Sequence, residues 1–128
     1  MNKPKISIFV EDSFDSAHSL PHLPKEHKCH NLHGHTYRIR IVVSGPVSKR
    51  NGWIVDYGVV KSHWSLLKDQ LDHQFLNAII PVSTCENLAA WIASELQQRF
   101  VVFGPPSVRV SAIELRETER CGVRLEVA

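Results

Sequence analysis

The 128-residue sequence has no long apolar run and no block of basic residues. No segment approaches the roughly 20 apolar residues that a membrane-spanning helix needs, so we expect no membrane span. The formal net charge is only +2 and the lysines and arginines are scattered, which makes nucleic acid an unfavoured partner. The first residues also lack the apolar core and cleavage site of a signal peptide.

Cysteine is scarce as well, with three residues in the chain. An odd and small number of cysteines suits reduced thiols in the cytoplasm rather than a framework of disulfides. A chain of this length can bury a core without cross-links, so we expect residues 1–128 to fold as one domain.

In the N-terminal third, apolar residues alternate with other residues in two segments, which predicts two β-strands. Ile6, Ile8 and Val10 alternate with other residues in a first strand that continues towards Ala17. Between residues 35 and 43 the odd positions from Tyr37 onward are apolar, which predicts a second strand with one buried face.

In the middle of the chain, apolar residues recur at the spacing expected for two amphipathic helices. Asp56 is the expected N-cap of an amphipathic helix that ends near Leu71. Ser83 and Glu86 have the spacing of a capping box, with Ser83 as the cap, and predict a second helix. Residues 104–106, Gly-Pro-Pro, should end that helix.

Alternating apolar residues return in segments 108–115 and 123–127, which predict two further strands. Strands grouped before and after two helices indicate an α+β fold with an antiparallel sheet, in the order ββααββ. Four strands leave two open edges, and pairing with another subunit is a common way to protect such edges.

The stretch from Phe14 to Tyr37 concentrates histidine. It contains six of the eight histidines: His18, His22, His27, His30, His33 and His35. His33 and His35 lie two residues apart at the start of the second strand, so both imidazoles face one side of the sheet. His18, at the end of the first strand, is the natural third ligand, and three protein ligands with an open position are typical of catalytic zinc. The alternative is that these are polar loop histidines that bind no metal and merely titrate. Spacing alone does not show which three of the six histidines would bind a metal.

Cys29 lies in the same stretch, between Lys28 and His30. A thiol among positive neighbours is a candidate base or nucleophile, or a fourth zinc ligand that would close the site and make it structural. The pair Asp72–His73 follows the first helix and could relay a proton, although a histidine is favoured near a helix C-terminus for electrostatic reasons alone.

Six segments together resemble the 6-pyruvoyl-tetrahydropterin synthase family, and more closely its bacterial 6-carboxy-tetrahydropterin synthase branch in queuosine biosynthesis. They are FDSAHSLP, KCHNLHGHTYRI, GWIVDYGVVK, LDHQFLN, STCENLAAWI and RETERCGV. The segments follow the family order and span nearly the whole chain. One departure is Cys85 in STCENLA, a segment closer to the animal form, where threonine or serine is usual; His30, between Cys29 and HGH, is another variable position.

The resemblance implies a role for each site residue. His18, His33 and His35 would be the zinc ligands, and Cys29 the catalytic cysteine. Asp72 and His73 would form a proton-relay pair. Glu117 would bind the pterin ring, and Thr84 would lie at the pterin edge. Without the resemblance, Glu117 is an ordinary surface charge.

The resemblance also implies an assembly and a reaction. The tunnelling fold joins the sheets of subunits into a barrel, and two trimers stack as a homohexamer with active sites between subunits. The expected activity is that of a zinc-dependent lyase that converts 7,8-dihydroneopterin triphosphate to 6-carboxy-tetrahydropterin, triphosphate and acetaldehyde. Alternatives within the fold are a pyruvoyl-forming synthase and an aldolase. An alternative from another class is a non-catalytic, zinc-stabilised binding domain.

Overall fold

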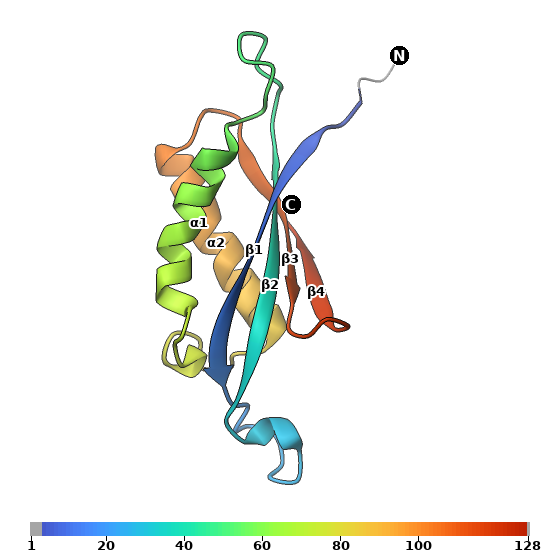
Figure 1. The fold of residues 1–128 in the computed structure, drawn as a ribbon, viewed down its shortest axis with the longest axis vertical. Helices are drawn as coiled ribbons and strands as arrows, with labels where there is room; N and C mark the ends of the chain where they lie inside the picture. The colour runs from blue at the N-terminus through green and yellow to red at the C-terminus, as the bar shows by residue number, and fades with distance from the viewer. Residues whose placement is uncertain (1–3, 128) are drawn as a thin grey trace.

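The computed structural model describes residues 4–127 and has two layers, a four-stranded antiparallel sheet and two helices on one of its faces (Figure 1). Its elements in chain order are β1 (Ser7–His18), η1 (Lys28–His30), β2 (His33–Ser44), α1 (Tyr57–Leu71), η2 (Leu76–Ala78), α2 (Cys85–Phe103), β3 (Arg109–Arg116) and β4 (Gly122–Glu126). The predicted ββααββ order is confirmed, with η1 and η2 as short 3₁₀ additions. No helix among residues 4–127 is both long and apolar enough to cross a membrane.

The strands lie in the order β1-β2-β3-β4, so β1 and β4 are the two edges that the sequence predicted. β1 and β2 contain 12 residues each and pair over their full length, from Ser7 opposite Ser44 to His18 opposite His33. Side chains alternate between the faces of a strand. Even positions of β1 and odd positions of β2 therefore point to the same face, which the helices cover.

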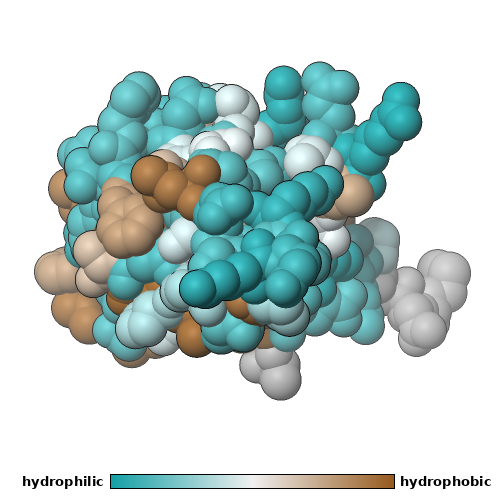
Figure 2. Space-filling model, turned by 90° about the horizontal axis from the view of Figure 1, so that it is seen from below, coloured by the Kyte–Doolittle hydropathy of each residue, from teal (hydrophilic) through white to brown (hydrophobic). Residues whose placement is uncertain are grey.

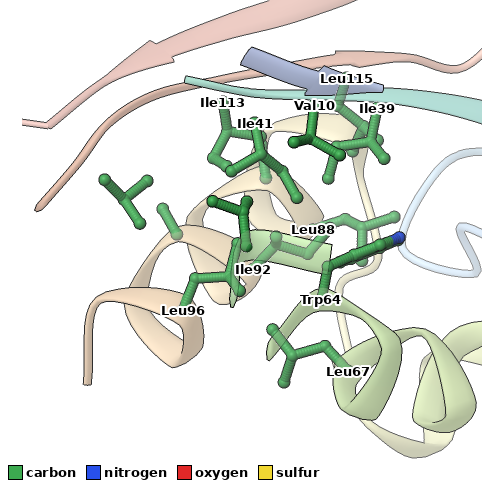
Figure 3. Close-up of a cluster of buried hydrophobic side chains, with 14 of the residues drawn as sticks. Val10, Ile39, Ile41, Trp64, Leu67, Leu88, Ile92, Leu96, Ile113 and Leu115 are labelled. Carbon is green, nitrogen blue, oxygen red and sulfur yellow. The ribbon is translucent and has the colours of Figure 1, made fainter. Parts of the chain in front are cut away.

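The core lies between that face and the helices (Figure 3). Its labelled members from the sheet and from the two helices are Val10, Ile39, Ile41, Ile113, Leu115, Trp64, Leu67, Leu88, Ile92 and Leu96. All are at most 6 % exposed. Burial of each such side chain stabilises the fold by roughly 1.5–3 kcal/mol before the loss of conformational entropy is counted.

The helix caps confirm one prediction and correct another. Asp56 caps α1, where its carboxylate accepts a hydrogen bond from the Gly58 N–H at 2.8 Å. For α2 the predicted capping box is wrong by one residue, because the cap is Thr84, whose hydroxyl accepts from the Asn87 N–H at 3.2 Å. Ser83 is fully buried and contacts His18. Thr84 offers the same capping chemistry and leaves Ser83 free for that contact.

The face of the sheet turned away from the helices carries a transverse row of alternating charge. Glu11, Arg40, Glu114 and Arg124 are successive register partners across all four strands. Arg40 Nε donates to Glu11 Oε1 at 2.7 Å, and Arg124 Nη1 forms an ion pair with Glu114 Oε2 at 2.5 Å. Each exposed pair adds little stability, but together they keep this face polar.

Asp12 joins α1 to the sheet from the helix-covered face. Its Oδ2 accepts hydrogen bonds from Trp64 Nε1 at 2.8 Å and from Lys68 Nζ at 3.1 Å. Burial alone would raise the pKa of Asp12, but hydrogen bonds from Trp64, the Ser13 backbone and Lys68 outweigh burial and lower that pKa.

Asp12→Ala should lower the free energy of unfolding by about 1–2 kcal/mol at neutral pH, because it leaves the buried indole N–H without its acceptor. The folded-state pKa is depressed, so the carboxylate stabilises the fold above its ordinary value of 3.8 and stops doing so as the pH falls below it. Denaturant unfolding of wild type and variant should thus differ at pH 7, and the difference should shrink as the pH falls below 3.8. Asp69→Ala, at an exposed position of α1, is the control. If both substitutions lowered the free energy of unfolding equally, the stabilising role assigned to Asp12 would be contradicted.

Candidate metal centre

His18, His33 and His35 come together at the end of the β1–β2 pair, where one nitrogen of each ring lies within 4.8 Å of the others. The register explains the cluster, because His18 is opposite His33, and His35 is opposite Ser16 on the same face. Among the described residues, this is the one group of three or more histidine, cysteine or acidic side chains close enough to hold a metal. The structure thus brings together the three histidines that the sequence favoured.

Two of the three histidine rings, those of His18 and His33, are oriented by hydrogen bonds to main-chain carbonyls. His18 Nδ1 lies 2.8 Å from the carbonyl oxygen of Ser83 and 3.1 Å from its hydroxyl. His33 Nδ1 lies 2.7 Å from the carbonyl oxygen of Asn31. A carbonyl only accepts, so each Nδ1 must donate a proton, which leaves the Nε2 lone pair free for a metal.

The Nε2 atoms of His18 and His35 are buried and have no hydrogen-bond partner. Burial holds the pKa of His35 below its ordinary value, which favours the neutral ring that binds metals. Buried nitrogen lone pairs that face one another without partners are costly unless a cation binds them. The donor set therefore fits Zn²⁺ or a similar ion with three imidazole ligands.

Glu117 lies against this cluster. Its Oε1 is 3.4 Å from His18 Nε2 and 3.3 Å from His35 Nε2, and its side chain is 29 % exposed. The contact with His18 is the main reason that the pKa of Glu117 is lowered, so the carboxylate is charged at neutral pH. Glu117 directly follows β3, on the helix-covered face, and is far from being the ordinary surface charge that its sequence context alone indicates.

Asp72 and His73 contact each other, with Asp72 Oδ2 3.1 Å from His73 Nδ1. Both residues are held by the backbone of Asp15 on β1. Its N–H donates to Asp72 Oδ1 at 2.9 Å, and its carbonyl accepts from the His73 N–H at 2.6 Å. The hydrogen bond from the Asp15 N–H is also the main reason that the pKa of Asp72 is lowered. His73 has φ 57°, a left-handed conformation that a non-glycine residue adopts at some cost and that is common at functional sites.

An open hollow of about 630 Å³ is lined by His73 and by His35 of the histidine cluster. The remaining lining residues are Asp15, Ser16, Ala17, Gly34, Thr36, Gln74 and Phe75. Its volume is within the range of small-molecule sites. Figure 2 shows the molecule from this end, where the surface is mostly hydrophilic with a few apolar side chains between.

Cys29 lies in η1, in the loop that connects β1 and β2, and is half-buried. The loop is fixed by the Leu20 N–H, which donates to the Cys29 carbonyl at 2.8 Å, and by the Cys29 N–H, which donates to His27 Nδ1 at 3.1 Å. Cys29 is not a member of the metal-ligand group of the described residues. The geometry therefore gives no support to the alternative in which Cys29 closes the zinc site.

The other two cysteines have different surroundings. Cys85 is 6 % exposed, and its thiol donates to the Leu115 carbonyl at 3.5 Å. Burial, with a smaller contribution from the Glu117 charge, raises the pKa of Cys85 to about 12. It is therefore a protonated core residue. Cys121 is exposed in the connection from β3 to β4.

Two residues near the metal centre were missed by the sequence analysis. Ser83 supports His18, and the sequence signal for it was misread as a helix cap. Tyr37 was interpreted only as an apolar strand position, yet its hydroxyl is buried without a hydrogen-bond partner beside the histidines. Its ring is 5.5 Å from that of His35 and stacks on Phe14 at 5.1 Å. A tyrosine in an otherwise aliphatic stripe was the available signal.

Comparison with known proteins gives a consistent family. The 6-pyruvoyl tetrahydropterin synthase family profile matches residues 7–127. The chain is 37 % identical over 118 residues to a 6-carboxy-5,6,7,8-tetrahydropterin synthase of Synechocystis sp., covering 87 % of this chain and 85 % of that protein. It is 33 % identical over 122 residues to a dihydroneopterin monophosphate aldolase of Pyrococcus furiosus, covering 95 % and 98 %.

A solved structure of 6-pyruvoyl tetrahydropterin synthase from Caenorhabditis elegans superposes with a TM-score of 0.83 at 26 % identity, covering 100 % of this chain and 99 % of that one. The antiparallel sheet with two helices is therefore the tunnelling fold that the sequence predicted. By profile, sequence and fold, the chain belongs to the 6-pyruvoyl tetrahydropterin synthase family.

Proposed function

We propose that this chain is a zinc-dependent lyase that converts 7,8-dihydroneopterin triphosphate to 6-carboxy-5,6,7,8-tetrahydropterin in queuosine biosynthesis, with release of triphosphate and acetaldehyde. The observation that carries this proposal is the cluster of His18, His33 and His35 with Glu117 against it, beside a hollow of small-molecule size. The similarity to the Synechocystis protein supports the carboxy-forming branch. Three unpaired thiols are compatible with a cytoplasmic enzyme.

In this proposal each residue has a separate task. Zn²⁺ on the three histidines would polarise the hydroxyl groups of the substrate side chain as a Lewis acid. Cys29, in the loop at this end of the sheet, removes a side-chain proton, and His73 with Asp72 returns one at the edge of the hollow. Glu117 recognises the pterin ring. Thr84, the α2 cap, is the proposed contact at the pterin edge.

An aldolase acting on dihydroneopterin is the second candidate, because the Pyrococcus relative carries that description and is matched over 98 % of its length. A pyruvoyl-forming synthase is the third. Both would use the same residues. The pyruvoyl-forming reaction eliminates triphosphate without breaking a carbon–carbon bond, whereas an aldolase breaks a carbon–carbon bond. A non-catalytic zinc domain is less well supported, because such a domain needs neither the Asp72–His73 pair nor the hollow.

We also propose that the chain assembles as a homohexamer of two stacked trimers. Open edges at β1 and β4 favour sheet pairing between subunits. A largely apolar groove of about 570 Å³ runs between α2 and β4, and Val101, Val102 and Phe103 nearby are each at least 68 % exposed. Exposed apolar surface of this kind is typical of an interface.

His33→Ala should weaken zinc binding by more than about 100-fold, since loss of even an outer supporting group costs about 10–100-fold. The measurement is zinc content by mass spectrometry after dialysis against a competing chelator. His22→Ala, an exposed histidine outside the cluster, should bind zinc like wild type. Full zinc occupancy in the His33 variant would refute the ligand assignment.

The zinc-loaded protein should turn over 7,8-dihydroneopterin triphosphate, with 6-carboxy-tetrahydropterin and acetaldehyde identified by mass spectrometry. Cys29→Ala should lower kcat by about 10²–10⁴-fold while zinc content stays the same, because it removes an acid–base group and no ligand. Cys121→Ala, which alters an exposed thiol, is the matched control. A pyruvoyl or aldol product would move the chain to one of the other two reactions. Wild-type activity in the Cys29 variant would remove that residue from the mechanism.

Sedimentation equilibrium should give six times the chain mass of 14.5 kDa. Val102→Asp, in the exposed apolar segment that ends α2, should shift the distribution towards smaller species, because it adds a charge to the proposed interface. The exposed substitution Asp69→Ala should leave the mass unchanged. A monomer at micromolar concentration would contradict the assembly.

A further inference from the structure

The row of alternating charge on the uncovered face of the sheet has a neighbouring row of different composition. Two residues further along each strand, the successive register partners are Ser13, Arg38, Arg116 and Gly122. We call these four residues the basic row. It contains a hydroxyl group, two guanidinium groups and a glycine, but no carboxylate. The basic row therefore carries positive charge that none of its own members neutralises.

Arg38 and Arg116 stand at the centre of the basic row, as direct partners on β2 and β3. The Cβ atoms of such partners lie about 4.5–5.5 Å apart, and like charges placed opposite each other destabilise a sheet. Both side chains are exposed, and neither forms an ion pair with any of residues 4–127. Neither packing in the core nor an ion pair therefore accounts for two guanidinium groups at these positions.

The carboxylates nearest to the basic row do not neutralise it. Glu11 and Glu114 form their ion pairs within the row of alternating charge. Asp15, the next residue of β1 on this face, accepts a hydrogen bond from the Thr36 hydroxyl at 2.5 Å. Glu119, in the connection from β3 to β4, forms no ion pair with another described residue. The positive charge of the basic row is thus left for a ligand to neutralise.

A hollow of about 390 Å³ opens on this face of the sheet. Its lining includes Ser13, Arg38 and Arg116 from the basic row, and Glu11, Arg40 and Glu114 from the row of alternating charge. The volume is that of a small-molecule site. Among the described residues, however, the lining has no aromatic side chain on which a flat organic ring could stack. Because both glutamates pair with arginines of their own row, the unpaired charge in the hollow is that of Arg38 and Arg116.

We propose that Arg38 and Arg116 form a binding site for a free phosphate-type oxyanion, held in this hollow between the two guanidinium groups. The planar fork of an arginine matches two oxygens of a phosphate group, and two adjacent forks suit an anion with several charges. The Ser13 hydroxyl, opposite Arg38, offers a further donor. The site lies on the face of the sheet opposite to the three histidines, so it is separate from the metal centre and independent of the proposed function.

The test is the binding of inorganic triphosphate to the zinc-loaded, full-length chain. It is measured by isothermal titration calorimetry at an ionic strength of about 0.15 M, which screens diffuse attraction. Arg38→Ala and Arg116→Ala should each weaken binding by about tenfold or more, because each removes charge-assisted hydrogen bonds to the anion. Arg109→Ala, which removes an exposed arginine of β3 outside the hollow, should bind like wild type. Adenosine triphosphate carries phosphate groups of the same kind and should bind no more tightly than the inorganic anion.

Thermal unfolding supplies a second measurement. Without phosphate, Arg38→Ala should not lower the Tm, because it removes a repulsion between like charges. An excess of triphosphate should raise the Tm of wild type and of Arg109→Ala, and should raise that of Arg38→Ala much less. Both measurements, repeated on the metal-free protein, should show the same dependence on Arg38, because the histidine cluster lies on the other face.

Equal affinity for triphosphate in wild type, Arg38→Ala and Arg116→Ala would overturn the inference. An equally large loss in Arg109→Ala would also overturn it, since that result indicates a diffuse effect of charge. Binding that disappears on removal of the metal would do the same, because the anion would then lie at the histidines. Much tighter binding of adenosine triphosphate would exclude a free oxyanion as the ligand. A chain that binds triphosphate through Arg38 but has no turnover would overturn the proposed function alone.

Discussion

The antiparallel pairing of β1 with β2 is the interaction on which the rest of the structure depends. The two strands pair over 12 residues each, and this register places His18 opposite His33 and Phe14 opposite Tyr37. A slip of one residue would turn a whole strand over, moving the histidines away from the helices together with the core side chains. The same register that buries the apolar core therefore also assembles the histidine cluster, and the two cannot vary independently.

The histidine cluster also depends on groups outside it. The carbonyls of Ser83 and Asn31 fix the tautomers of His18 and His33. The Asp15 backbone holds Asp72 and His73. These supports come from main-chain atoms of segments whose positions are determined by the core. Rigid backbone acceptors hold imidazoles in place better than flexible side chains do, so the centre is organised before a ligand arrives.

Period and spacing were enough to predict the ββααββ order, the cap at Asp56 and the shared face of His33 and His35. They failed at Ser83, because Thr84 has the same capping chemistry and only tertiary contact decides which of the two meets His18. They also failed at Tyr37, since alternation identifies a buried position but does not show whether its hydroxyl finds a partner. The contact of Glu117 with the histidines joins residues far apart in the chain. Only the resemblance to a family indicated a role for Glu117, and no local pattern contained it.

The row of alternating charge on the uncovered face of the sheet has a consequence for any larger assembly. Glu11, Arg40, Glu114 and Arg124 neutralise one another along a line across the strands, but each side chain remains at least 32 % exposed. Removing water from such a row costs more than the ion pairs return, so this face does not suit a dry contact with another layer of protein. If the open edges of several copies close into a ring with this face inward, the interior is a water-filled lumen lined by paired charges. The charged side chains of the sheet would then make this lumen polar, and they lie away from the histidine cluster at the end of the strands.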